Sequence, residues 1–381
     1  MNDALHRVAT ACPGQWLYLL ADEGVVYSET QNRFAGLTAA GVSAYRAFDA
    51  GAVVEDLRRF NDPRGAPAPD SRLEAIHALS QGIFPAQEPR HEWPPLEYSS
   101  SANIEIHGIP VLFEFPPGPL EDLCRDYFRN CPFSAQPTRY HLHAQPTGDG
   151  WTIYANGLEL LSLLRDEQLG LGFLHAARSL LYAAAEYDVA FHAAVVADAN
   201  QGVLLSAPRE FGKSTLAAYL MAQDFELVTD EPALLHLDTC SVSSLRLPIS
   251  LKEGSWTALR QQWSQLASAP THVRSDGVKI RLLHPPLVSS APSQSLTHIV
   301  FPEYRSACTP HTERSPPLRT LSLLNEGGMI LAKHLARDKF EALLRFVCTT
   351  PANIIRYDSL EEAGRMIRSL STETALPRNR V

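Results

Sequence analysis

The segment that most constrains this chain is an apolar strand, a loop and a helix, followed by a second strand that ends in two acids. Residues 203–215 read VLLSAPREFGKST, and residues 225–231 read FELVTDE. A loop that ends in Gly-Lys-Ser/Thr is typical of sites whose backbone N–H groups surround phosphate. Ala207 stands where that pattern has its first glycine. The sequence therefore predicts a strand–loop–helix–strand unit built for nucleotide chemistry.

The polar residues of this segment suit the binding of a nucleotide and a metal. Gly212 allows the backbone to approach phosphate closely, Lys213 supplies a positive charge, and the Ser214 hydroxyl can ligate Mg²⁺. Asp230 and Glu231 end the second strand at the sheet edge where the loop is expected, and there they can bind metal or accept a proton. The residues expected to bind the nucleotide are Ala207, Gly212, Lys213, Ser214 and Thr215.

A non-catalytic interpretation of the same residues is also open. Asp230 and Glu231 can serve as a helix cap or an exposed strand end, and Glu210 places negative charge near the expected phosphates. On this interpretation the chain keeps the fold, but the loop that contains Ala207 and Glu210 no longer binds a nucleotide.

Further residues in the same order extend the pattern. His192 is followed by AAVV, a turn at 200–202 precedes the loop, and PISLK ends at Lys252. Together these residues resemble the HPr kinase/phosphorylase-related proteins over roughly residues 161–370. The resemblance implies a P-loop core related to phosphoenolpyruvate carboxykinase, ATP and Mg²⁺ as cofactors, and phosphorylation of a serine hydroxyl.

The resemblance also implies a role for each polar residue. Lys213 and Ser214 would hold phosphate and Mg²⁺, while Asp230 would receive the hydroxyl proton. Glu231 would help to hold metal, and His192 would lie near Asp230 and tune it.

Three basic residues are candidates for binding phosphate or an anionic substrate. They are Lys252, Lys279 and Arg281. Lys279 and Arg281 alternate along a strand-like run, which places both on one face. Each of the three residues can equally be a solvated surface residue without a ligand.

The sequence of the N-terminal part predicts three strands followed by three helices. The strands are Trp16–Leu20, Val25–Ser28 and Phe34–Leu37; the helices are Ala39–Phe48 after a Thr38 cap, Val53–Phe60 and Ser71–Gln81. This winged-helix-like pattern resembles the PqqD-like domains that bind leader peptides of ribosomally made, modified peptides. Such domains hold the leader as an added strand at a sheet edge. A small cap domain without a ligand fits the same pattern.

A proline-rich linker at 84–96 divides the chain. We expect residues 1–88 to form the PqqD-like domain and residues 89–381 the HPr-kinase-like domain. Within the latter, 89–160 supply N-terminal strands and a helix, and 161–381 the nucleotide-binding core and C-terminal tail. The expected fold class is α/β, α+β over the whole chain.

The segment 89–160 also contains two histidines, His141 and His143, on one face of an expected strand. A spacing of two suits metal ligation in some sites. The local sequence offers no third ligand, so a surface or core pair is the favoured interpretation. This strand is expected to form a hairpin with Trp151–Tyr154 about residues 148–150.

The composition of the 381 residues limits the partners. A net charge of −9 argues against general nucleic-acid binding, and no apolar run is long enough to span a membrane. The six cysteines form no Cys-x-x-Cys pair, which favours free thiols and a cytoplasmic location. Self-association follows from the resemblance only.

The expected function is ATP-dependent phosphorylation of a hydroxyl, most simply serine, on a ribosomally made peptide or small protein in peptide natural-product biosynthesis. The alternative is a catalytically inactive pseudokinase scaffold that binds a precursor peptide for other modifying enzymes.

Overall fold

The structure, a computed structural model, is described here for most of the chain. The described residues are 6–20, 23–50, 101–115, 119–136, 138, 140–147, 150–155, 158–208, 211–274, 276–284, 291, 293–332 and 335–374. The expected helices Val53–Phe60 and Ser71–Gln81 and the proline-rich linker at 84–96 lie outside these residues. The chain mixes helices and sheets as an α/β class requires.

Two compact units divide the chain. The first combines residues 1–89 with 314–352, and the second combines 90–313 with 353–381. Segment 314–352 therefore belongs with the N-terminal residues, whereas the sequence analysis placed it with the nucleotide-binding core.

The first unit contains a four-stranded antiparallel sheet in sequence order. Its strands are β1 (His6–Ala9), β2 (Gln15–Leu20), β3 (Glu23–Ser28) and β4 (Arg33–Leu37). The last three match the expected strands, and β1 is an additional edge strand that pairs with β2.

Helix α1 (Ala39–Asp49) follows the sheet and begins where its sequence predicts. The Thr38 side chain accepts a hydrogen bond from the Gly41 N–H at 3.3 Å, which satisfies one of the unpaired donors at the helix start. Tyr45 and Phe48 are buried in a cluster with Leu17 and Val26 of the sheet.

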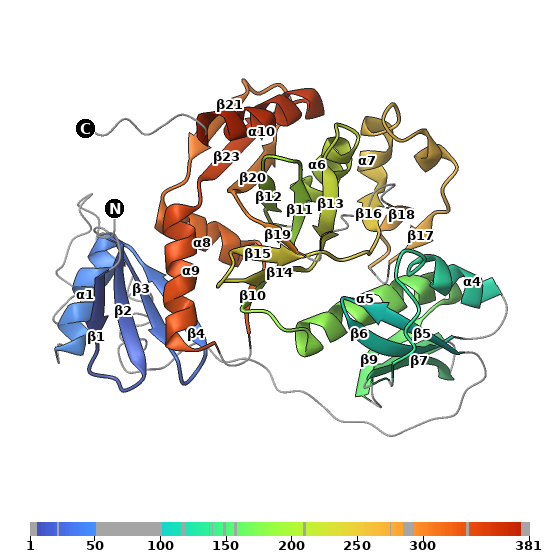
Figure 1. Cartoon of the computed structure of the whole chain (residues 1–381), viewed down its shortest axis with the longest axis horizontal. Helices are drawn as coiled ribbons and strands as arrows, with labels where there is room; N and C mark the ends of the chain where they lie inside the picture. The colour runs from blue at the N-terminus through green and yellow to red at the C-terminus, as the bar shows by residue number, and fades with distance from the viewer. Residues whose placement is uncertain are drawn as a thin grey trace. The chain divides into compact units, whose positions relative to one another are not determined.

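Two helices, both labelled in Figure 1, and a short strand from the second half of the chain belong to this unit. They are α8 (Pro317–Glu326), β22 (Met329–Leu331) and α9 (Arg337–Thr349). The Phe340 ring of α9 stacks on Tyr27 of β3 at 4.0 Å between centroids and 5° between planes. The Tyr27 hydroxyl donates to the Leu335 carbonyl, and Arg7 forms an ion pair with Glu341 at 2.7 Å. These long-range contacts explain why segment 314–352 joins the first unit.

The second unit contains a five-stranded sheet ordered β5 to β9. Its strands are β5 (Ser101–Ile106), β6 (Ile109–Glu114), β7 (Tyr140–Thr147), β8 (Gly150–Ala155) and β9 (Leu158–Leu164). Strands β6 and β7 are parallel and are linked through α4 (Pro119–Asp126), while the other pairs are antiparallel. The expected hairpin of β7 and β8 is confirmed.

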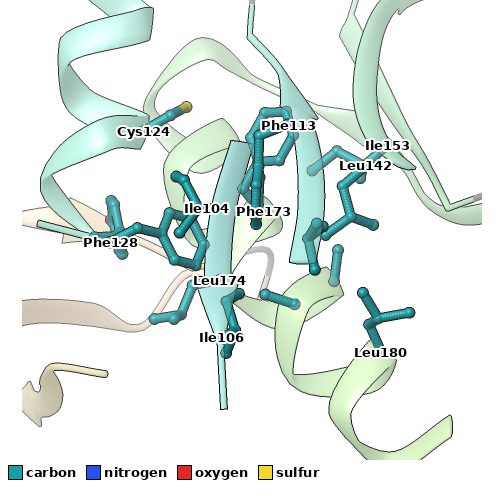
Figure 2. Packing of buried hydrophobic residues seen from close by; sticks show 14 of the residues in the cluster. Ile104, Ile106, Phe113, Cys124, Phe128, Leu142, Ile153, Phe173, Leu174 and Leu180 are labelled. Carbon is teal, nitrogen blue, oxygen red and sulfur yellow. The ribbon is translucent and has the colours of Figure 1, made fainter. Parts of the chain in front are cut away.

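Helix α5 (Asp166–Ala184) packs on one face of this sheet. Figure 2 shows sheet residues such as Ile104, Phe113 and Leu142 gathered with Phe173 and Leu174 of the helix. Leu169, Phe173 and Ala177 of α5 are accordingly buried in this cluster. The opposite face of the sheet carries the residues that alternate with these, because successive side chains of a strand point to opposite sides.

A six-stranded sheet contains the two strands on either side of the Gly212-Lys213-Ser214 segment. Its order is β13 (Glu226–Asp230), β11 (Ala193–Ala197), β12 (Gly202–Ser206), β20 (His298–Tyr304), β23 (Ala352–Tyr357) and β21 (His311–Arg314). Strand β11 lies between β12 and β13 and is antiparallel to both, so β12 and β13 run in the same direction. Their carboxyl ends consequently share one edge of the sheet.

Helix α6 (Lys213–Met221) connects β12 to β13 and contacts both strands, with α10 (Leu360–Thr374) against it. Leu216 and Leu220 of α6 are buried with Val203 and Leu205 of β12. The expected strand–loop–helix–strand order is therefore present, within a mixed sheet.

The remaining strands of the second unit form two smaller sets. One is β16 (Ile249–Lys252), β18 (Lys279–Leu283) and β17 (His272–Val273), with α7 (Glu253–Ala258) following β16. The other pairs β19 (Ser293–Ser295), β15 (Ser241–Ser243), β14 (Ala233–His236) and β10 (Val189–Phe191) in this order.

Two expectations about the chain as a whole can be compared with this fold. All six cysteines lie among the described residues and are free. Across the described ranges, no helix is both long and apolar enough to cross a membrane.

Candidate functional site

The candidate site begins where the buried strand β12 ends and α6 starts. Gly212 is the N-terminal cap of α6 and has a left-handed backbone with φ of +83°. An ideal Cβ at Gly212 would lie 3.6 Å from the Tyr357 hydroxyl, so backbone conformation rather than space favours glycine here. Ala207 is 2% exposed and is not among the described residues with positive φ. An alanine at this position therefore does not strain the backbone. Arg209 and Glu210 of the same loop lie outside the described residues.

Lys213 is buried at the first position of α6, and its side chain turns back onto the loop. The ammonium group donates to the Ala207 carbonyl at 2.7 Å and to the Pro208 carbonyl at 3.2 Å. These bonds balance a buried charge with loop dipoles. A phosphate at this position would replace them with a charge-assisted contact.

Ser214 joins α6 to the end of β13. Its hydroxyl donates to Asp230 Oδ1 at 3.0 Å. This length is that of an ordinary hydroxyl–carboxylate hydrogen bond, and the contact places the Ser214 hydroxyl beside the end of β13. The next residue, Thr215, shares a hydrogen bond of 2.6 Å with Ser255 of α7.

Glu231 lies immediately after β13 with a positive φ of 64° and is held from two sides. His192 Nδ1 is 2.7 Å from Glu231 Oε1, and Arg178 lies 3.8 Å from Oε2. The sequence analysis placed His192 beside Asp230, whereas its direct partner is Glu231.

The pKa values of the two adjacent carboxyl groups, Asp230 and Glu231, are shifted in opposite directions. Burial raises the pKa of Asp230, although Arg178 and the Ser214 hydrogen bond act against it. Burial also penalises the charge of Glu231, but the hydrogen bond from His192 and the charges of Arg178 and Lys213 lower its pKa to about 2. Asp230 is thereby suited to accept a proton, and Glu231 is suited to stay ionised.

Arg178 of α5 is a member of this group that the sequence analysis missed as a functional residue. One guanidinium nitrogen donates to the Asp230 backbone carbonyl at 3.2 Å, and the side chain is only 14% exposed. Its position in an otherwise apolar helix is a sequence signal, because a buried arginine requires a polar or charged partner. The sequence does not identify that partner, since Asp230 and Glu231 lie far from Arg178 along the chain.

The three basic candidates are divided between the two faces of one small sheet. Lys252 pairs with Ile280, and Leu251 pairs with Arg281, so Lys252 faces the side opposite to Arg281 and Lys279. Arg281 donates to the Leu266 carbonyl and lies 4.0 Å from the Trp256 ring centroid. Lys279 is exposed. The structure thus does not gather Lys252, Lys279 and Arg281 into one cluster.

The structure does bring Lys213, Ser214, Asp230, Glu231 and His192 into one connected group. The group offers a buried cation, a hydroxyl hydrogen-bonded to a carboxyl group, and two adjacent carboxyl groups whose pKa values are shifted in opposite directions. No known protein family matches the chain, and no curated protein matches its sequence. The site must accordingly be judged on its own geometry.

Proposed function

We propose that this chain is an ATP-dependent, Mg²⁺-requiring kinase-like protein that phosphorylates a hydroxyl, most simply that of serine. The observation that carries the proposal is the 3.0 Å contact of Ser214 Oγ with Asp230 Oδ1 at the start of α6. This contact places the Ser214 hydroxyl, which would hold Mg²⁺, beside the carboxyl group that would accept the proton of the acceptor hydroxyl.

The proposed reaction assigns a task to each residue of the group. The acceptor oxygen forms a bond to the γ-phosphorus, the bond from that phosphorus to the bridging oxygen of ADP breaks, and Asp230 takes the acceptor's proton. Lys213 and the loop amides neutralise phosphate charge, and Ser214 with Glu231 would hold Mg²⁺, which supplies charge stabilisation when bound. His192 and Arg178 keep Glu231 anionic.

Two conservative substitutions separate proton transfer from metal binding. Asp230→Asn should abolish phosphate transfer yet keep Mg²⁺–ATP affinity within a few-fold, because the amide cannot take the proton. Glu231→Gln should instead raise the Mg²⁺ concentration required. If Asp230→Asn removes Mg²⁺-dependent nucleotide binding, Asp230 is a metal ligand and not the base.

The acceptor in this proposal is a ribosomally made peptide or a small protein. The support is the four-stranded sheet of the first unit, whose edge strands β1 and β4 offer positions where a leader peptide could add as a strand. Incubation with γ-labelled ATP and serine-containing peptides, with and without a leader segment, tests this. Label should enter leader-bearing peptides preferentially; equal labelling of both sets contradicts leader recognition.

One observation favours the second candidate, a pseudokinase scaffold that holds a precursor peptide. The Lys213 ammonium already bonds two loop carbonyls, Ala207 and Pro208, which compete with phosphate for it. A scaffold would bind leader peptide without binding ATP. Calorimetric titration with each ligand distinguishes the two candidates.

A further inference from the structure

A second group of polar side chains lies in the same unit on the five-stranded sheet, away from the residues of the phosphate loop. His141 and His143 alternate with core residues on β7, so both lie on the face opposite to Leu142. Strand β6 pairs Glu114 with His143, which brings a carboxylate onto that same face. The third ligand that the local sequence lacked is supplied by the neighbouring strand.

The three side chains converge to distances that one ion can span. Their nearest ligand atoms all lie within 4.8 Å of one another. His141 Nε2 is 2.9 Å from Glu114 Oε2, and the two imidazole rings are 4.6 Å apart between centroids. Ligand atoms about 2.0–2.1 Å from a tetrahedral Zn²⁺ lie roughly 3.3 Å apart. Small side-chain rotations are therefore enough to close the set around a cation.

The surroundings of the three residues favour ligation. The Tyr154 ring stacks on His143 at 5.2 Å, which fixes the orientation of that imidazole. The side chains of His141 and Glu114 are 34% and 20% exposed, which leaves a path for an ion from solvent.

We propose that Glu114, His141 and His143 form a binding site for a first-row divalent cation of the Zn²⁺ class. Two imidazoles and one carboxylate suit such ions better than Mg²⁺ or Ca²⁺, which prefer all-oxygen sites. Three protein ligands leave at least one coordination position for water or a bound ligand.

The test is calorimetric titration of the chelator-treated full chain with Zn²⁺, without nucleotide or Mg²⁺. We expect one ion per chain, and at least tenfold weaker binding in His143→Ala and in the isosteric Glu114→Gln. Glu105→Gln is the matched control, because Glu105 alternates with the core residues Ile104 and Ile106 on the adjacent strand β5. His311→Ala controls for an exposed histidine elsewhere. Both controls should bind as the unmodified chain does.

Replacement of Zn²⁺ by Co²⁺ gives a second readout that identifies the ligands. Visible d–d absorption that disappears in Glu114→Gln, without a sulfur-to-metal charge-transfer band, supports the site. A charge-transfer band would assign the ion to cysteine. No Zn²⁺ binding, or unchanged binding in His143→Ala and Glu114→Gln, overturns the proposal. Their melting temperatures in chelator should equal that of the unmodified chain, which excludes unfolding as the cause.

Discussion

At the scale of residues, the main feature of this protein is a pair of adjacent carboxyl groups with opposite behaviour. Asp230 is buried beside a hydroxyl and gains little compensation for its charge, while Glu231 is held by His192 and approached by Arg178. The pattern DE at the end of a strand predicts carboxylates at this edge, but not which one remains protonated more easily. That difference arises from the hydrogen bond of His192 to Glu231 and from the deeper burial of Asp230, which are tertiary effects.

The two carboxyl groups should give opposite pH dependences of stability. The lowered pKa of Glu231 contributes stability that is present above its ordinary pKa and is lost as the pH falls toward 2. Glu231→Gln should therefore cost about 2 kcal/mol more at about pH 6.5 than at about pH 3. Urea unfolding at the two pH values measures this.

Asp230→Asn should show the reverse trend. A raised pKa means that the stability contributed by protonated Asp230 is present at low pH and is lost as the pH rises through its folded pKa. The variant should consequently gain stability relative to the unmodified chain between acid and neutral pH. The same trend in both variants would contradict the assignment of one stabilised and one destabilised carboxylate.

At the scale of elements, local sequence signals predict part of the described structure. Thr38 and α1, the β7–β8 hairpin, and the strand, loop and helix around Gly212 all follow from caps, turns and periodicity. Strand β1 is among the elements that are not predicted, because its four residues have no clear alternation and depend on pairing with β2. The distribution of Lys252 and Arg281 over two sheet faces also depends on register, which the sequence does not specify.

The start of α6 should be sensitive to backbone conformation. Gly212→Ala places a Cβ at φ of +83°, which should cost about 1–2 kcal/mol of unfolding free energy. Gly254→Ala is the control, since Gly254 lies within α7 and its Cβ would meet nothing within 4 Å. It should be neutral or stabilising by up to about 1 kcal/mol. Equal destabilisation by both changes would argue against a left-handed requirement at Gly212.

The N-terminal cap of α1 makes an independent prediction. Thr38→Ala removes the hydroxyl that accepts from the Gly41 N–H and should destabilise the protein by about 1 kcal/mol. Thr38→Ser keeps the acceptor and should restore most of that loss. Chemical unfolding of both variants provides the measurement, and an equal loss in Thr38→Ser would contradict a capping role.

At the scale of the whole molecule, the chain folds as two compact units whose boundaries are not contiguous in sequence. Composition and the proline-rich linker predict a break near residue 89, but they give no sign that 314–352 returns to the N-terminal unit. The reason is that the apolar face of α9 packs against β3, which lies about 300 residues earlier in the sequence. Such pairing depends on complementary side-chain packing and carries no local signal.

Phe340 should therefore act as a core residue of the first unit. Phe340→Ala removes a stacked ring from between Tyr27, Tyr18 and Phe34 and should cost about 3–5 kcal/mol. Hydrogen exchange should report faster exchange in β3 and leave β12 and α6 protected. Phe133→Ala, at a ring that is 79% exposed, should change stability by less than about 0.5 kcal/mol. Equal loss of protection in β3 and in β12 and α6 would contradict a core role of Phe340 in the first unit alone.

Calorimetric titration of the full chain with Mg²⁺–ATP, beside Lys213→Ala and the control Lys339→Ala, tests whether the group around Lys213 binds nucleotide. We expect saturable binding that Lys213→Ala abolishes and Lys339→Ala, on α9, leaves unchanged. Absence of binding in the unmodified chain at millimolar nucleotide would contradict the kinase proposal and favour the scaffold.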